Sequence, residues 1–400
     1  MVMQQKTADI IVVGAGISGL SLALLCEKAG MKVALVERKV EKVIPISSPK
    51  ISAWVSALNR TSEKLLEKIG VFQTLIDHKL AASYCAMELT TSAHTSTLDF
   101  HANDVAAKNL GHIVDNHYLK ALLWEKVHQA QAIHVEEVMP VRWSEKDKCL
   151  HTDCDYTIHA PILVGCDGQN SWVREQLGIK VDKDTIQDHA IVAIAKHQIA
   201  HDNTARQCFL DQGIIASLPL WDPYTSVIVY SLDKKYIPED EKQRLKYATE
   251  ACKKAFVTTQ PESLTELRVH PISSMHAQKY YQKSGFLVAD AAMSIHPLAG
   301  LGLNCGLQAV GVLADRLKKP LLGEKQVLID QAGRKYEHAI RGYNAFTKSS
   351  IQSIHKCLVT SGSPWRSAVS KVAFLSAQNL PFIKQQMIYH ALYGIQAHTS

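Results

Sequence analysis

Two short runs of consecutive apolar residues lie near the N-terminus, at Ile10–Val13 and Val33–Val36. An unbroken apolar run is typical of a strand that is buried on both faces of a parallel sheet. The segment between the runs is mostly apolar as well, and it opens with glycines in place of a polar turn. The pattern therefore predicts a buried strand, a tight turn, a helix and a second buried strand.

The glycines of this turn are Gly14, Gly16 and Gly19, in the spacing G-x-G-x-x-G. The first permits the turn, the second lets the backbone approach a pyrophosphate, and the third lets the helix and strand pack closely. Glu37 ends the second strand, where a carboxylate can accept hydrogen bonds from an adenosine ribose. This unit predicts a dinucleotide site, and it leaves NAD and FAD both open.

A third apolar run, Phe286–Ala289, ends at Asp290. Ligands of open parallel sheets bind at the carboxyl ends of the strands. A carboxylate at such an end can accept hydrogen bonds from the hydroxyl groups of a ribityl chain. Because FAD carries a ribityl chain and NAD does not, this second motif favours FAD.

The loop that follows Asp290 is rich in residues that shape the backbone. Pro297 stiffens the turn, and Gly300 and Gly302 free the backbone to approach a flat ring. A helix is expected from Asn304 to about Leu317, and the amides at a helix N-terminus stabilise negative charge such as that of a reduced flavin ring. The loop is therefore predicted to face the isoalloxazine of FAD.

A further apolar run lies between the two motifs, within residues 160–179, and ends at Asp167 and Gly168. A helix is expected to start near Ser171 and to carry Arg174. An aspartate after a strand is also a common turn device, and for Asp167 taken alone both functions stay open. Its position between the two motifs favours a place close to the cofactor.

The pattern changes in the centre of the chain. Segments 189–200, 207–220 and 224–233 are short β-rich runs separated by polar turns, which predicts an antiparallel sheet with one solvent-facing side. Residues 76–104 are expected to join it. From about residue 331 apolar positions recur at helical spacing. These helices either pack on the body of the protein or turn an apolar face with interspersed basic residues toward a membrane.

Composition narrows the classes of function. With 400 residues, 46% of them hydrophobic and 20% charged, the chain is typical of a soluble protein with two interleaved domains. The net charge of +6 suits an anionic cofactor or a membrane surface, but no basic run is dense enough for nucleic acid. Nine cysteines, several within apolar runs, indicate a reducing cytoplasm. No signal peptide, spanning helix or metal site is expected.

The three motifs around Gly14, Asp167 and Asp290, in this order and spacing, resemble those of the class A flavoprotein monooxygenases of the para-hydroxybenzoate hydroxylase type. Within that class, the chain is similar to the ubiquinone-biosynthesis hydroxylases of the UbiH and VisC branch. The segments that carry this narrower resemblance are Trp54–Phe72, Gly111–Leu123, Phe209–Leu220 and Ala289–Leu307. The resemblance implies an α/β fold in which a doubly wound FAD-binding domain is interleaved with an antiparallel β-sheet substrate domain, followed by C-terminal helices.

The resemblance also implies domain limits and site residues. The FAD-binding domain would comprise residues 1–75, 105–180 and 280–335, the substrate domain residues 76–104 and 181–279, and the C-terminal helical region residues 336–400. Residues implied to contact FAD are Gly14, Ala15, Gly16, Gly19, Glu37, Arg38, Asp167, Asp290, Pro297, Gly300, Gly302, Leu303 and Asn304.

The implied activity is hydroxylation of a polyprenylated phenol in ubiquinone biosynthesis by an FAD-dependent monooxygenase that uses O2, with NAD(P)H as electron donor. Other ubiquinone-biosynthesis proteins and the inner face of a membrane are further partners that the resemblance leaves open, and the location is cytoplasmic. No catalytic side chain is assigned, because the cofactor carries the difficult chemistry.

Four residues depart from the family pattern. Trp54 stands where the family usually has arginine, Ala289 where it has glycine, Leu301 where it has glutamine, and Gln308 where it has arginine. Loss of a guanidinium and an amide removes polar partners near the flavin. Two alternatives therefore stay open: a hydroxylase of another aromatic compound, or a catalytically silent subunit of a biosynthetic assembly.

Overall fold

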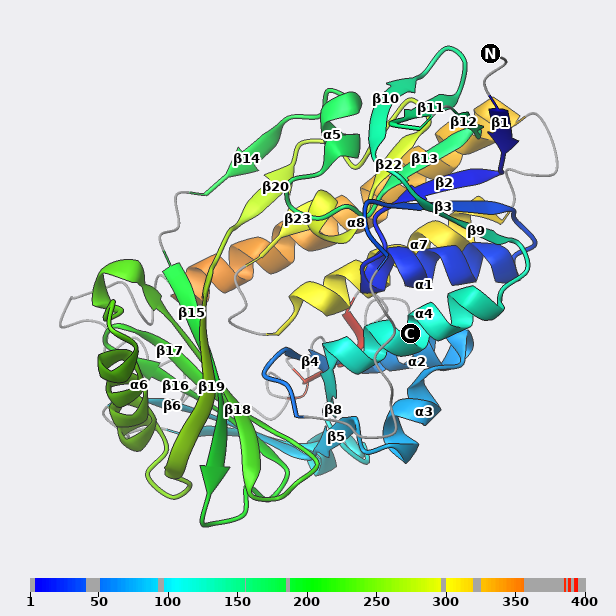
Figure 1. Ribbon diagram of the computed structural model, residues 1–400. Helices are drawn as coiled ribbons and strands as arrows, with labels where there is room; N and C mark the ends of the chain where they lie inside the picture. Colours follow the sequence, from blue (N-terminus) through cyan, green and yellow to red (C-terminus); the bar gives the residue numbers. More distant parts are fainter. Residues whose placement is uncertain are drawn as a thin grey trace.

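The protein is described here by a computed structural model. It describes residues 4–40, 51–92, 97–154, 156–184, 188–295, 300–318, 325–355, 385, 388–389 and 392–394. Two large sheets dominate the described chain, and they lie at opposite ends of the molecule (Figure 1).

The first large sheet has six strands in the order β21-β22-β13-β2-β3-β9. All its neighbouring strands are parallel except β21 and β22. This parallel core confirms the doubly wound sheet that the apolar runs predict. Its strands are β2 (Ile10–Val13), β3 (Val33–Glu37), β9 (Ile133–Glu137), β13 (Ile162–Gly165), β21 (Tyr281–Gln282) and β22 (Gly285–Leu287).

Helices and a second sheet cover the two sides of this core. Helices α1, α4 and α7 lie on one side, and β10 to β12 lie on the other (Figure 1). Helix α1 packs against both α4 and α7, and α7 packs against α8. The helices of this part are α1 (Ile17–Lys28), α2 (Arg60–Ile69), α3 (Phe72–Asp77), α4 (Asn116–Gln129), α5 (Trp172–Gln176), α7 (Gly302–Leu317) and α8 (Lys325–His355).

Three smaller sheets complete this part of the chain. The four-stranded sheet β1-β12-β11-β10 contains Gln4–Thr7, Tyr156–His159, Cys149–Thr152 and Pro140–Ser144. The sheet β4-β8-β5 contains Val55–Leu58, Gly111–Asp115 and Ala81–Tyr84. The sheet β14-β20-β23 contains Val181–Lys183, Met275–Ala277 and Met293–Ser294. Short 3-10 turns are η1 (Ala102–Val105), η2 (Lys234–Tyr236) and η3 (Ala289–Ala291).

The second large sheet has seven strands in the order β19-β15-β18-β17-β16-β6-β7. Its pairings are antiparallel except for β16 with β6, because β6 comes from the separate segment 86–91. The strands are β6 (Ala86–Thr91), β7 (Thr97–His101), β15 (Asp188–His197), β16 (Thr204–Leu210), β17 (Gly213–Pro219), β18 (Thr225–Asp233) and β19 (Pro261–Pro271), with helix α6 (Glu241–Ala255) beside them.

The prediction that one side of this sheet faces solvent is wrong. Cys208 and Ile215 pack beneath α6, whereas their neighbours Phe209 and Ile214 belong to an apolar cluster on the other side. Successive residues of a strand point to opposite faces, so both faces of β16 and β17 are buried. The face away from α6 is therefore packed against other apolar side chains of the protein.

The C-terminal helical prediction is only partly covered by the described residues. Helix α8 begins at Lys325, before the expected change near residue 331, and ends at His355. All of the apolar and basic positions between 366 and 387 lie outside the described residues. Ile388 is described and is 4% exposed within an apolar cluster, so at this position the chain packs on the protein.

Among the helices that the structure describes, none combines the length and the apolar character that a membrane-spanning helix requires.

Candidate functional site

Three segments that are distant in sequence meet at one edge of the six-stranded sheet. The amide of Cys166 donates to the carbonyl oxygen of Val13 at 2.8 Å, and the amide of Val288 donates to that of Gly165 at 3.0 Å. Because β2, β13 and β22 run in parallel, their carboxyl ends lie side by side. The glycine loop, the Asp167 turn and the Asp290 turn are thus brought together, as predicted.

The glycines of the first loop have distinct structural roles. Gly14 has a φ of +99°, and a Cβ there would lie 2.5 Å from the carbonyl oxygen of Cys166. A Cβ on Gly19 would overlap the carbonyl oxygen of Gly14, whereas a Cβ on Gly16 would meet no atom within 4 Å. Gly14 and Gly19 are therefore required by packing, and Gly16 borders open space.

Glu37 connects the end of β3 to this loop. Its Oε2 accepts a hydrogen bond of 2.7 Å from the amide of Ala15, and its Oε1 accepts one of 2.8 Å from the amide of Arg38. The Arg38 side chain is exposed. The half-buried carboxylate holds the loop and keeps lone pairs for a ribose hydroxyl.

Asp167 serves as a turn device and keeps one oxygen without a partner among the described residues. Its Oδ2 accepts a hydrogen bond of 3.0 Å from the amide of Val173 at the start of α5, so it acts as a turn device. Its Oδ1 is buried and has no hydrogen-bond partner among the described residues. Burial raises the pKa of this carboxyl group. An unsatisfied buried oxygen is costly, and a ligand hydroxyl or amide would satisfy it.

Arg174 ties the Asp167 turn to the Asp290 turn. Its side chain is 7% exposed and donates to the carbonyl oxygens of Gln169, at 2.9 Å, and Ala291, at 3.0 Å. Both acceptors are backbone atoms, so the guanidinium fixes the distance between the two turns. Arg174 is a structural residue of the site.

Asp290 lies at the C-terminal side of β22, after a sharp change in backbone direction. The apolar run predicts a strand to Ala289, but β22 ends at Leu287 because Ala289–Ala291 forms a 3-10 turn. The Asp290 side chain is accessible to solvent, yet enough protein surrounds it to raise the pKa of its carboxyl group. No described residue forms a hydrogen bond with this side chain.

Ala289 has a φ of +53°, a conformation that favours glycine. The left-handed conformation costs an L-residue about 1–2 kcal/mol in the folded state. Replacing it by glycine removes that cost, but the greater conformational freedom of glycine in the unfolded chain offsets about 0.5–1 kcal/mol of the gain. We expect Ala289→Gly to raise the free energy of unfolding of the FAD-free protein by about 0.5 kcal/mol, measured by thermal melting. Ala130→Gly, at a φ of −74°, is the control and should lower the melting temperature. A lower melting temperature for both variants would contradict the explanation.

The loop around residues 300–304 begins α7. The helix starts at Gly302, two residues earlier than expected, and no side chain caps its first amides. Gly300 has a φ of +60°, and Leu301 and Leu303 are half-buried. Free amides at a helix N-terminus favour a negatively charged ligand. Pro297 and the neighbouring His296 lie outside the described residues.

The side chain of Asn304 is fully engaged within the protein. Its Oδ1 accepts hydrogen bonds from the amide of Asn59, at 3.0 Å, and from Oγ of Ser62, at 2.7 Å. Its Nδ2 donates to the carbonyl oxygen of Ala57 at 2.7 Å. Asn304 therefore anchors the start of α7 to the junction of β4 and α2, and only its backbone is free to face a ligand.

The junction of β4 and α2 is a part of the site that the sequence reasoning missed. Asn59 caps α2, and the buried Glu63 accepts from Arg60 at 2.6 Å and contacts Nδ1 of His112 at 2.7 Å. This network fastens α2 to β8. An asparagine just before an amphipathic run is an N-cap signal, so the helix could have been predicted, but its contact with Asn304 could not.

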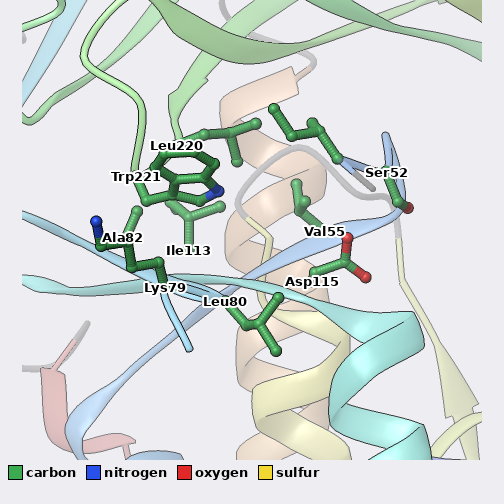
Figure 2. Close-up of a pocket in the computed structure, with 10 residues that line it drawn as sticks. Ser52, Val55, Lys79, Leu80, Ala82, Ile113, Asp115, Leu220 and Trp221 are labelled. Atoms are coloured by element: carbon green, nitrogen blue, oxygen red, sulfur yellow. The ribbon is translucent and has the colours of Figure 1, made fainter. Parts of the chain in front are cut away.

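Trp54 and a small hollow lie beside this junction. Trp54 is 48% exposed, and its ring meets that of His117 edge-on at 4.7 Å. In the hollow, Leu220 and Trp221 from the β17–β18 loop face Leu80 and Ile113 from the β4-β8-β5 sheet (Figure 2). Asp115 at its side accepts from the amide of His117 at 2.9 Å, and burial raises its pKa. The hollow marks where the two large parts of the protein meet.

Taken together, the described groups fit FAD. Two helices, α1 and α7, begin without a side-chain cap, which suits the pyrophosphate at one and a reduced ring at the other. Open space beside Gly16 permits close approach of a phosphate. The oxygen of Asp167 that has no partner among the described residues and the exposed carboxylate of Asp290 offer acceptors for ligand hydroxyl groups.

A family model described as an FAD binding domain matches residues 7–342. The chain belongs to this FAD-binding family. FAD is therefore its cofactor, and dinucleotide-binding folds hold their ligand at the carboxyl ends of the parallel strands.

Curated relatives of this flavoprotein are ubiquinone hydroxylases. It is 27% identical over 326 residues to the ubiquinone hydroxylase UbiM of Neisseria meningitidis, covering 77% of this chain and 68% of the relative. It is 28% identical over 337 residues to the 3-demethoxyubiquinol 3-hydroxylase of Escherichia coli, covering 79% and 81%. The human ubiquinone biosynthesis monooxygenase COQ6 is 24% identical over 408 residues, covering 89% and 86%.

Solved structures share the fold along nearly the whole flavoprotein. The p-nitrophenol 4-monooxygenase PnpA of Pseudomonas putida superposes with a TM-score of 0.77 at 17% identity, covering 98% of this chain and 99% of that one. An aklavinone-11 hydroxylase solved with FAD and aklavinone superposes with a TM-score of 0.68 at 20% identity, covering 89% and 70%. The predicted fold class is confirmed, and the flavoprotein is an FAD-dependent monooxygenase that acts on an aromatic substrate with O2.

Proposed function

We propose that this monooxygenase hydroxylates the ring of a polyprenylated phenol in ubiquinone biosynthesis, with NAD(P)H as the electron source. The observation that carries the proposal is the apolar cluster where the seven-stranded sheet meets the loop that precedes α7. Phe209 and Ile214 of the seven-stranded sheet share one cluster with Leu301 and Ile295 of the loop that flanks the flavin position. Apolar side chains beside the flavin position exclude water and suit a substrate with a hydrocarbon tail.

The assignment of residues to FAD is part of the same proposal. Bound FAD, once reduced, supplies the electrons that activate O2. The glycine loop and Glu37 would hold the ADP half, Asp290 the ribityl chain, and Asp167 a neighbouring group, while the backbone from Gly300 to Asn304 would face the ring. Residues 1–75, 105–180 and 280–335 form the proposed FAD-binding domain, residues 76–104 and 181–279 the substrate domain, and residues 336–400 the C-terminal region.

The direct test supplies purified FAD-loaded protein with NAD(P)H, O2 and a phenol that carries a short prenyl tail. We expect O2 consumption that depends on the phenol, and a product with one added oxygen atom in its mass spectrum. Hydroxylation of tail-free aromatics alone would favour the hydroxylase of another compound. Bound FAD without O2 consumption would favour the silent subunit, an alternative that Trp54, Leu301 and Gln308 motivate.

The first two of those residues give a sharper test. Indole offers a single donor and no charge, and leucine offers none, so backbone amides must hold the flavin without their help. We expect Trp54→Arg combined with Leu301→Gln to tighten FAD binding about 10-fold, as one added charge-assisted hydrogen bond would, and to preserve phenol-dependent O2 consumption. Titration of the FAD-free protein measures the affinity. Trp221→Arg, at a tryptophan that is equally exposed, is the control; a similar gain there would attribute the effect to charge alone.

A further inference from the structure

Two apolar clusters join the face of the seven-stranded sheet that lies away from α6 to the start of α7. In the first cluster, Leu301 packs against Phe209 and its neighbours. In the second, Val229 of β18 and Ala57 of β4 pack against the same buried residues, and a Cβ on Gly300 would lie 3.4 Å from Cβ of Ala57. This face of the sheet is therefore turned toward the loop that is proposed to face the ring of FAD.

Gln207 of β16 lies on this face, between the two clusters. Side chains alternate along a strand, so Gln207 shares the face of Phe209, two residues later. The strand register places Gln207 beside Leu89 of β6 and beside Ala216 of β17, and Ala216 lies beside Val229. These residues form one row across the sheet, and Gln207 is the polar member of an otherwise apolar row.

The side-chain amide of Gln207 lacks a polar partner within the described protein. The residue is 6% exposed, and its side chain forms no hydrogen bond with a described residue. Leu89, Ala216 and Val229 are half-buried, so some accessible surface remains along the row. A buried amide without a hydrogen bond is costly, and a hydroxyl group of a ligand would satisfy it.

We propose that Gln207 is a substrate-binding residue that recognises the hydroxyl group of the phenol. A side-chain amide offers both donors and an acceptor, which match the oxygen and the hydrogen of a phenol hydroxyl. The apolar side chains of the row suit the aromatic ring, and one hydrogen bond among them fixes the orientation of that ring. The assignment rests on the proposed function for the class of substrate. It makes Gln207 the residue that selects phenols over aromatic hydrocarbons.

The first experiment needs no substrate. Because the Gln207 amide lacks a partner in the free protein, an apolar side chain of the same length should pack at least as well. We expect the melting temperature of FAD-loaded Gln207→Met to equal or exceed that of the wild type. Gln212→Met, at an exposed glutamine of the same hairpin that accepts from the hydroxyl of Tyr247, is the control and should not raise it. A lower melting temperature for Gln207→Met would show that the amide holds the fold, and would overturn the proposal.

The second experiment measures binding to the FAD-loaded protein by calorimetry. It uses two pairs of compounds, ortho-prenylphenol with prenylbenzene and phenol with benzene, in which one member lacks the hydroxyl group. We expect Gln207→Met to reduce the preference for the phenol of each pair about 10-fold, as the loss of one hydrogen bond would. Gln212→Met should keep the wild-type preference, and so should Ser231→Ala, at a buried polar residue of β18 in the neighbouring row.

The outcomes separate this assignment from the proposed function. An unchanged preference in Gln207→Met, or a loss of preference in Ser231→Ala alone, would overturn the role of Gln207. If the preference for phenol over benzene falls but ortho-prenylphenol is neither bound nor hydroxylated, Gln207 keeps its role and the proposed function fails. If the wild type binds no member of either pair, both proposals fail.

Discussion

Asp290→Ala is expected to weaken FAD binding by about 10- to 100-fold, the loss of one or two hydrogen bonds to a charged acceptor. The carboxylate is exposed and has no hydrogen-bond partner among the described residues, so its removal leaves no buried group unpaired and the fold should persist. Flavin titration of FAD-free protein, together with thermal melting, measures both effects. Asp315→Ala, which removes an exposed carboxylate on α7 that pairs with Lys318, should leave FAD binding unchanged.

The pH dependence provides a second readout on the same residue. Enclosure raises the pKa of Asp290 in the FAD-free protein, whereas ligand hydroxyl groups that donate to the carboxylate would lower that pKa in the complex. FAD affinity should therefore be complete above the pKa of the FAD-free state and decline as the pH falls through it. The Asp290→Asn variant should lose the part of this pH dependence that comes from residue 290. Any contribution of Asp167 to the pH dependence is the same in the variant and in the wild type. An identical pH profile for Asp290→Asn and wild type would remove Asp290 from the cofactor site.

Two glycines of the first loop should respond to alanine in opposite ways. At Gly19 a Cβ would overlap the carbonyl oxygen of Gly14, and a backbone carbonyl cannot move aside. We expect Gly19→Ala to lower the free energy of unfolding by more than about 3 kcal/mol. At Gly16 a Cβ meets no protein atom, so Gly16→Ala should fold with stability within about 1 kcal/mol of the wild type.

FAD binding distinguishes the pair further. A methyl group at Gly16 would occupy the space where the backbone has to approach a pyrophosphate. The folded Gly16→Ala protein should therefore bind FAD at least about 100-fold more weakly. Denaturant unfolding of FAD-free protein and flavin titration separate the two effects. Normal FAD affinity in Gly16→Ala would place the pyrophosphate elsewhere.

Much of the fold could be predicted because its signals are local. The unbroken apolar runs at Ile10–Val13 and Val33–Val36 and the glycine spacing between them each specify a short piece of backbone, and the structure contains them as β2, α1 and β3. Parallel strands share one carboxyl edge, so the meeting of the Asp167 and Asp290 turns also followed. The seven-stranded sheet was predicted in outline, but the burial of its second face depends on contacts across the molecule.

The parts that could not be predicted depend on long-range pairing. Nothing near Asn304 in the sequence indicates that its side-chain amide forms hydrogen bonds with the backbone of Ala57 and Asn59, more than 240 residues earlier. The turn at Ala289 breaks a run that reads as a strand, because an apolar run carries no information on φ. The burial of Ile388 in one apolar cluster with Phe209 likewise depends on packing across the molecule, which no periodicity near the C-terminus reveals.

The parallel pairing of β2, β13 and β22 also constrains when the flavoprotein can mature during synthesis. Ile10 pairs with Ile162, and Leu163 pairs with Gly285. The central strand β13 therefore has one partner strand that is synthesised before it and one that is synthesised about 120 residues after it. Strand order cannot be completed until the third segment has left the ribosome, and α7 follows later still. Earlier nascent chains expose the apolar edges of β2 and β13, which are a template for misassociation. Chaperone occupancy should consequently be greatest on nascent chains that end before β22.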